Sequence, residues 1–296
     1  MTDLPRRLRS YVQADVFADR PGAGNPLAVV LDAEGLGDDD MQAIARWTRL
    51  PETTFVLPAL AADASYRLRI FSPRREVPFA GHPSVGTAHA VLEAGIAAPR
   101  DGLLVQEGKA GLLPLRVSGT GRERTIAVRT PKARVVEIAS PDDARLRDVL
   151  AGLPLGALPQ ALMDGGRRWW LAELADEASL RSATPDWDAV ERLANATDSM
   201  GLCVFARSDD PVYYLAVRAW VGAPARFEDA ASGAANATLA AWLADRDALP
   251  GDSGFYRVSQ GREVGHDAII ELTVADGEVW SGGRVCSVVR GEIDWR

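Results

Sequence analysis

The stretch Phe71–Gly95 decides the fold, and it reads FSPRREVPFAGHPSVGTAHAVLEAG. It predicts the end of a strand, a sharp corner at Gly81-His82-Pro83, and then a helix. Small residues keep that helix thin and apolar on most sides, which is typical of a helix that is buried all round. The corner presents His82 and free backbone N–H groups at the positive end of the helix, where an anionic ligand binds favourably. We interpret the stretch as one half of an active site.

The same pattern returns about half a chain later, in the segment Arg226–Gly233, which reads RFEDAASG. A strand is expected to end there, a polar corner with Asp229 follows, and a thin apolar helix continues through Leu243. Two such corners form an internal repeat and predict two similar halves. We expect an N-terminal half over residues 1–128, with a strand within 282–296 as a candidate to complete it. The C-terminal half is expected over 129–281.

The run Pro51–Leu57 is rich in β-branched and aromatic residues and predicts a strand. The carboxylate of Glu52 lies at the start of that strand. A glutamate at a strand start is usually only solvated, so Glu52 by itself does not define a site. The next run, Tyr66–Phe71, alternates large apolar residues with arginines, as a half-buried strand does. It leads directly into the first corner.

Local capping and turn signals predict two further boundaries of secondary-structure elements. Asp39 and Gln42 have the spacing of a capping box, so a helix is expected to begin there and to stop before Pro51. Near the C-terminus, the small residues Ser281–Gly283 predict a turn between two strands.

Composition excludes several classes of function. The formal net charge is −8, which argues against a nucleic-acid partner and against a polybasic membrane patch. No run of 18 apolar residues and no signal-peptide core is found, so a cytoplasmic protein that does not enter a membrane is expected. The only two lysines are Lys109 and Lys132, and a Schiff-base mechanism is therefore disfavoured.

The histidines and cysteines do not suggest a metal site. His82, His89 and His266 are scattered, and two cysteines without a close motif cannot build a zinc site alone. His89 lies on the predicted buried helix and is expected to be a packed core residue. Cys203 and Cys286 both lie in apolar, strand-like runs, where a small buried hydrophobe is the expected role.

The two corners suggest a common chemistry. If the N-termini of the two thin helices converge, they form a cleft with N–H donors on both walls, which suits a small carboxylate substrate. Glu52, His82 and Asp229 could move protons around that substrate. From the residues alone, His82 is interpreted equally well as a functional or as a structural residue.

Four segments in the chain, in this order, resemble the PhzF-like isomerase family of phenazine biosynthesis. They span essentially the whole chain: Gly24–Val30 (GNPLAVV), Glu52–Phe55 (ETTF), Phe79–Ala88 (FAGHPSVGTA) and Glu228–Gly233 (EDAASG). The resemblance implies an α+β fold of the diaminopimelate-epimerase-like type. In that fold two similar halves, each a curled, mostly antiparallel sheet or barrel around a central helix, enclose the active site between them.

The resemblance also implies roles for residues. Glu52 would be the acid/base that shuttles the proton, with His82 and Asp229 as its partners across the cleft. Members of the family isomerise a dihydro-hydroxyanthranilate, are typically homodimers, and need no cofactor. The positions expected to bind substrate are Asn25, Gly81, Ser84, Ser232 and Gly233.

The sequence departs from the family pattern at two places, and the physiological substrate is left open for that reason. Ala234 occupies the position of a site serine, and Gln260–Asp267 (QGREVGHD) replaces the usual Arg-Pro after a glycine. Two alternatives to a PhzF-like isomerase also remain open. One is an epimerase or racemase with a thiol on each wall, although neither cysteine lies at a corner. The other is a non-catalytic protein that binds small anions on the same scaffold.

Overall fold

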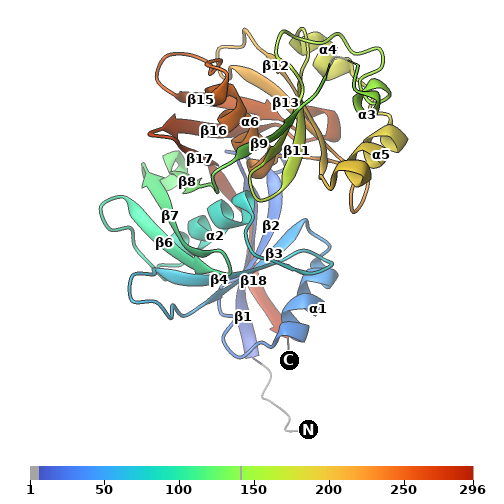
Figure 1. Cartoon of the computed structure of the whole chain (residues 1–296). Helices are drawn as coiled ribbons and strands as arrows, with labels where there is room; N and C mark the ends of the chain where they lie inside the picture. Colours follow the sequence, from blue (N-terminus) through green and yellow to red (C-terminus); the bar gives the residue numbers. More distant parts are fainter. Residues whose placement is uncertain (1–6, 141, 296) are drawn as a thin grey trace. The chain divides into compact units, whose positions relative to one another are not determined.

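The computed structural model describes residues 7–140 and 142–295, which form two compact units. Unit 1 comprises the described residues up to Arg129 together with those from Gly282 onward, and unit 2 comprises Thr130–Ser281. In each unit a curled sheet packs around one helix, α2 in unit 1 and α6 in unit 2 (Figure 1). This arrangement confirms the predicted α+β class with two similar halves.

Unit 1 is closed by strands from both ends of the chain. Its strands are β1 (Arg7–Val16), β2 (Asn25–Val30), β3 (Glu52–Leu57), β4 (Tyr66–Phe71), β5 (Glu76–Val77), β6 (Leu103–Gly108), β7 (Gly111–Ser118), β8 (Thr125–Arg129) and β18 (Val285–Trp295). They pair in the order β18–β1–β2–β3–β4–β6–β7–β8. The β2–β3 and β4–β6 pairs are parallel and the other pairs are antiparallel.

Unit 2 repeats this pattern. Its strands are β9 (Arg134–Ile138), β10 (Ala161–Asp164), β11 (Arg168–Glu173), β12 (Gly201–Arg207), β13 (Leu215–Val221), β14 (Phe227–Asp229), β15 (Phe255–Gln260) and β16 (Ala268–Ala275). They pair as β9–β10–β11–β12–β13–β15–β16, with β11–β12 and β13–β15 parallel. Strand β17 (Glu278–Gly283) leads from unit 2 into the last strand of unit 1.

The predicted internal repeat is therefore a repeat of topology. In each unit a short strand, β5 or β14, pairs antiparallel with its longer neighbour, β4 or β13. A central helix of 13 residues follows, α2 (Gly81–Glu93) or α6 (Gly233–Asp245). The next strand, β6 or β15, then pairs parallel with the same neighbour. Both corners thus occupy equivalent places in the two units.

Helix α2 is buried along almost its whole length, as its composition predicts. Every residue from Gly81 to Val91 is buried. Its thinness is required by the sheet, because a Cβ atom on Gly86 would lie 2.6 Å from both Leu27 Cδ2 and Val16 Cγ2. The corner predicted at Gly81-His82-Pro83 is in fact the first turn of this helix, which begins directly after Ala80.

The remaining helices cover the outer faces of the sheets. They are α1 (Asp38–Thr48) in unit 1, and α3 (Ala144–Arg147), α4 (Glu177–Ser182) and α5 (Trp187–Thr197) in unit 2; short 3-10 turns lie at η1 (Gly121–Glu123) and η2 (Arg262–Val264). No helix in the described part of the chain is long and apolar enough to cross a membrane.

The predicted capping box of Asp39 and Gln42 is wrong. Helix α1 begins at Asp38 because Gly37 takes the extended N-cap conformation. The carboxylate that turns back to the N-cap is therefore that of Asp40, which accepts a hydrogen bond from the Gly37 N–H at 3.4 Å. Gly37 with Asp40 and Asp39 with Gln42 have the same spacing, and the sequence alone does not distinguish between them.

The turn predicted at Ser281–Gly283 is also wrong, because these residues end strand β17. A Cβ atom on Gly282 would lie 2.1 Å from the Ile126 carbonyl oxygen, so glycine is needed there for close approach of two backbones. The chain reverses instead at Asp276-Gly277, where both residues have positive φ, 53° and 73°. An Asp-Gly pair is a typical hairpin signal.

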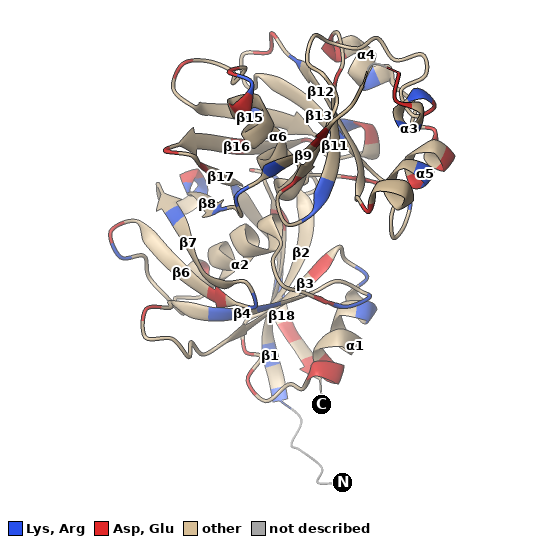
Figure 2. Cartoon of the chain, viewed as in Figure 1, with Lys and Arg blue, Asp and Glu red and all other residues tan. Residues whose placement is uncertain are grey.

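Charged pairs hold the segment that leads into α2. Arg69 on β4 donates from Nε and Nη2 to the two carboxylate oxygens of Glu76 at 2.8 and 2.9 Å, and from Nη1 to Asp38 at 2.7 Å. Lys109 also donates to Glu76, at 2.6 Å. In Figure 2 the basic and acidic segments of unit 1 are interleaved, as these pairs require. The segment that precedes α2 is therefore held by charged contacts at both Arg69 and Glu76.

Candidate active site

The structure brings Glu52 and His82 together within unit 1. Glu52 is the first residue of β3, and His82 lies in the first turn of α2. Glu52 Oε2 lies 3.5 Å from His82 Nε2, and the side chains are 13% and 9% exposed. The distance is longer than a normal hydrogen bond but lies within ion-pair range. Catalytic contacts often tighten only when substrate is bound.

Neighbouring contacts explain why these two residues meet. Two residues beyond Glu52, the Thr54 hydroxyl accepts a hydrogen bond from the Thr87 hydroxyl of α2 at 2.8 Å. The Thr54 hydroxyl in turn donates to the Ala28 carbonyl of β2 at 3.2 Å. This buried chain fixes the register of α2 on β3. It therefore places the start of the strand beside the start of the helix.

The other predicted residues of unit 1 lie around the same end of the sheet. Asn25 is the first residue of β2 and is 1% exposed, and Leu27, two residues later, pairs with Glu52. Ser84 is fully buried, and its hydroxyl donates to the Ala80 carbonyl at 3.0 Å. The roles of Asn25 and Ser84 in binding substrate stay predictions.

The first turn of α2 offers backbone donors in addition. The hydrogen bond from the Ser84 N–H to the Ala80 carbonyl, at 3.3 Å, begins the helix's own ladder. Pro83 has no N–H to offer. The amides of Gly81 and His82 therefore lie outside that ladder, at the positive end of the helix, and can face an anion.

Asp229 ends β14 in unit 2 and begins the second corner. Its Oδ1 accepts a hydrogen bond from the Ala231 N–H at 3.3 Å, which fixes the side chain against the turn. Ser232 is the N-cap of α6, and its hydroxyl accepts from the Ala235 N–H at 3.3 Å. Gly233 is the first residue of the helix. The corner is thus built as the sequence predicts.

Two buried amides at this corner were missed by sequence reasoning. Gln260, the last residue of β15, accepts a hydrogen bond from the Ser232 N–H at 3.1 Å. Asn236 donates to the same Gln260 oxygen at 2.7 Å. The Ser232 amide, a predicted substrate donor, is therefore already used within the protein. The amides of Gly233 and Ala234 lie in the first turn of α6, where the helix's own backbone ladder offers no acceptor. A buried polar residue at the end of a strand, just before Gly261, was the available signal.

The predicted residues thus form two groups, one in each unit. Glu52, His82 and Gly81 belong to unit 1, whereas Asp229 and Gly233 belong to unit 2. A single site that contains both groups stays a prediction. Among the described residues, no three His, Cys, Asp or Glu side chains form a cluster that could hold a metal ion.

Comparison with known proteins gives the family. The chain matches the family of phenazine biosynthesis-like proteins, PhzC-PhzF, over residues 14–288. It belongs to the PhzF family. The relatives include the trans-2,3-dihydro-3-hydroxyanthranilate isomerase of Pseudomonas aeruginosa, 32% identical over 87% of this chain and 87% of that protein. An uncharacterized isomerase of Mesorhizobium japonicum is 32% identical over 96% of this chain and 98% of its own.

The PhzF fold is seen directly in a solved structure. The PhzF-family phenazine biosynthesis protein of Bacillus anthracis superposes with a TM-score of 0.83 at 24% identity, covering 97% of this chain and 99% of that one. This likeness confirms the predicted fold. With relatives named as isomerases over nearly the whole length, the present PhzF-family chain is an enzyme of the isomerase class.

The two thiols of this PhzF-family member have raised pKa values, for the same physical reason. Cys203 on β12 is fully buried, and burial raises the pKa of its thiol to about 12. Cys286 on β18 is half-buried, and burial together with the charge of Asp15 raises the pKa of its thiol too. A thiol reacts as its thiolate, so these values disfavour a two-thiol epimerase. His89 is 5% exposed, which confirms it as a packed residue. The same burial lowers the pKa of its imidazole.

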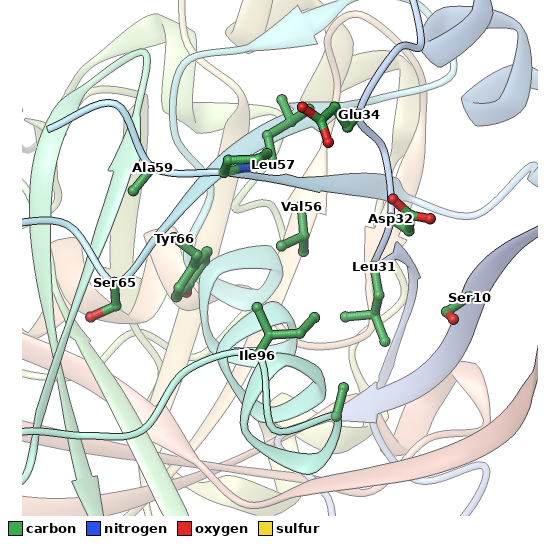
Figure 3. Close-up of a pocket in the computed structure, with 12 residues that line it drawn as sticks. Ser10, Leu31, Asp32, Glu34, Val56, Leu57, Ala59, Ser65, Tyr66 and Ile96 are labelled. Atoms are coloured by element: carbon green, nitrogen blue, oxygen red, sulfur yellow. The ribbon is translucent and has the colours of Figure 1, made fainter.

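A separate pocket lies at the other end of α2. Its volume is about 500 Å³, and it is lined by strand residues such as Val56 and Tyr66 and by Ala94 and Ile96, which follow the helix (Figure 3). Among the described residues that line it, none is a predicted site residue. The predicted site residues Gly81, His82 and Ser84 lie at the N-terminal end of α2, away from this pocket.

Proposed function

We propose that this PhzF-family chain is an isomerase that moves a proton between two carbon atoms of a small carboxylate substrate, with Glu52 as the general acid/base. The observation that carries the proposal is the distance of 3.5 Å between Glu52 Oε2 and His82 Nε2, at the point where β3 and α2 begin. Both side chains are largely shielded from solvent, and electrostatic interactions with a bound substrate are stronger in such a site than in water.

The proposed reaction balances without any co-reactant. The Glu52 carboxylate removes a proton from a substrate carbon, and the C–H electron pair becomes part of a shifted double bond. The pair of the former double bond then takes up a proton from the Glu52 carboxyl group at another carbon. The acidic carboxyl proton exchanges with solvent between the two steps, so in D2O a deuteron is delivered. A proton transfer of this kind needs only an acid/base group in place, and we therefore propose a reaction independent of cofactors.

The remaining residues are assigned to orientation and charge. His82, next to Glu52, would position the substrate or relay the proton, and Asp229 would do so from unit 2. The amides at the starts of α2 and α6, including those of Gly81 and Gly233, would hold the substrate carboxylate, since helix N-termini favour anions. We include in the proposal the homodimer that is typical of the family, which sedimentation of the purified protein tests.

The substrate class follows from the carboxylate site and from the relatives. The Pseudomonas aeruginosa relative is named for trans-2,3-dihydro-3-hydroxyanthranilate, so we propose a cyclic or amino-acid-like unsaturated carboxylate of similar size. Ala234, which lacks the hydroxyl expected at its position, gives a reason to test other members of this class as well.

The experiment follows deuterium. Wild-type protein is incubated in D2O with trans-2,3-dihydro-3-hydroxyanthranilate and with a panel of related unsaturated carboxylates, and exchange at carbon is read by NMR. We expect Glu52→Gln to abolish deuterium incorporation, typically a loss of about 10²–10⁴-fold for a general acid/base, while ligand binding stays nearly intact. Glu34→Gln, a change at an exposed glutamate of the same unit, serves as the matched control.

Each result discriminates between the candidate functions. Equal exchange by Glu52→Gln and wild-type protein contradicts the assignment of Glu52. Binding of carboxylates without exchange of any of them favours a non-catalytic anion-binding protein. Exchange with inversion at a single carbon, and no shift of the double bond, identifies an epimerase.

A further inference from the structure

The side chain of Gln260 joins the two ends of the Asp229 corner. It is fully buried, at 0% exposed, at the end of β15. Its Nε2 donates to the Asp229 carbonyl at 2.8 Å, and its Oε1 accepts from the Ser232 N–H at 3.1 Å. One amide therefore holds the backbone on both sides of the turn that carries the Asp229 carboxylate.

Asn236 adds two hydrogen bonds to this network of Gln260, and together they form a brace. Its Nδ2 donates to Gln260 Oε1 at 2.7 Å and to the Ser232 carbonyl at 2.9 Å. Both acceptor positions of the Gln260 oxygen are thus occupied, which fixes the orientation of its amide. Because Asn236 belongs to the first turns of α6, the brace also fixes where the helix begins.

The sheet places this glutamine at the corner. Strand β13 pairs with both neighbours, with Ala219 opposite Asp229 of β14 and Val217 opposite Gln260 of β15. The chain then leaves β15 through Gly261, whose φ is +98° and where a Cβ atom would lie 2.3 Å from the Ala230 carbonyl oxygen. Any other residue would push the two backbones apart, so Gly261 keeps Gln260 within reach of the corner.

We propose that Gln260 is a positioning residue for the isomerase reaction, acting through Asp229 and through the first turn of α6. The inference rests on the proposed function of Asp229. Its Oδ1 is tied to the Ala231 N–H within the turn, so a rotation of the peptide after Asp229 re-aims the carboxylate. A misplacement of about 1 Å can cost about 10²-fold in rate.

The test is a double-mutant cycle of Gln260→Met and Asp229→Asn, assayed by deuterium exchange into trans-2,3-dihydro-3-hydroxyanthranilate. Methionine has a similar length and removes all three hydrogen bonds. We expect Gln260→Met to lower kcat about 10–100-fold in the protein that retains Asp229. In the Asp229→Asn background the same substitution should lower kcat less than about 3-fold, because the effects of groups that act as a unit are not additive. Additive losses overturn the proposal, whereas an Asp229→Asn protein with full activity overturns the proposed function instead.

Gln106→Met is the matched control for packing. Gln106 on β6 is 2% exposed. It pairs with Tyr66, the first residue of β4. Thr53, which follows Glu52, pairs with Phe71 at the opposite end of β4. We expect near wild-type kcat in this variant. A loss as large as that of Gln260→Met would indicate a general effect of removing a buried amide, and would count against a positioning role.

Two further measurements keep the proposal falsifiable if Gln260→Met folds poorly or if the probe carboxylate is not turned over. In Gln260→Glu, protonation of the introduced carboxyl restores a donor to the Asp229 carbonyl, so its turnover relative to wild type should rise as the pH falls; a loss as deep as that of Gln260→Met at every pH overturns the Asp229 contact. Hydrogen exchange of the Ser232 amide should speed up in Gln260→Met, which removes the acceptor of the Ser232 N–H, with the interior of α6 still protected. Unchanged protection of Ser232 overturns the brace without reference to activity.

Discussion

Replacing Gly86 with alanine tests why the central helix of unit 1 is thin. In a helix interior, alanine is favoured over glycine by about 0.8–1.0 kcal/mol, so propensity alone predicts a more stable protein. The packing predicts the opposite, because the new Cβ atom would lie 2.6 Å from Leu27 Cδ2 and 2.6 Å from Val16 Cγ2. Both neighbours are fully buried and cannot turn toward solvent.

The magnitude follows from setting these two effects against each other. Overpacking of a well-filled core costs about 1–3 kcal/mol, and the gain in propensity offsets about 1 kcal/mol of it. A net loss of about 1 kcal/mol is expected, which lowers the Tm by about 2–4 °C for a unit of roughly 150 residues. Glu52 and His82 depend on the position of this helix, so exchange activity should fall as well.

The assay is thermal and guanidinium unfolding of Gly86→Ala beside two comparison proteins. Ala43→Gly, at a half-buried position of α1, measures the effect of propensity without the clash and should cost about 1 kcal/mol. In a Val16→Ala background, which removes one of the two clashing methyl groups, the penalty of Gly86→Ala should shrink. A Gly86→Ala protein that is more stable than wild type by about the propensity difference would refute the reasoning.

Two further predictions concern titratable groups. Hydrogen bonds from Arg69, and to a lesser extent from Lys109, hold the pKa of Glu76 below its ordinary value of 4.5, although burial acts in the opposite direction. The ionised carboxylate therefore stabilises the folded state. This stabilisation is complete above pH 4.5 and is lost as the pH falls through the pKa of the folded state. Glu76→Gln should therefore show a smaller loss of stability than wild type between neutral pH and pH 3–4 (about the titration range of a carboxylate), and identical pH profiles would contradict the role of the pair. For the thiols, iodoacetamide at pH 8 should spare buried Cys203, whose pKa is raised to about 12, and should modify half-buried Cys286 first. Deuterium exchange should survive that modification, and its loss would revive a two-thiol mechanism.

Local sequence determined much of the fold because its signals act over a few residues. The alternation of Tyr66–Phe71 is a strand with its apolar side chains buried, and the small residues of α2 are buried as their composition requires. The likeness of the two corners anticipated the repeated topology, since each corner joins a short strand to a central helix. Glu52 was found at the start of β3, where the pattern of the strand placed it.

Only the tertiary structure decided which distant groups meet. Glu52 and His82 lie 3.5 Å apart because the parallel strands of unit 1 and the Thr87–Thr54 hydrogen bond set α2 against β3, a register that no local pattern encodes. The bonds from Gln260 to Asp229 and Ser232 depend in the same way on β13, which pairs with both neighbouring strands. Such contacts depend on pairing between strands far apart in the chain, so the residues that carry them resemble ordinary buried amides until the sheet is formed.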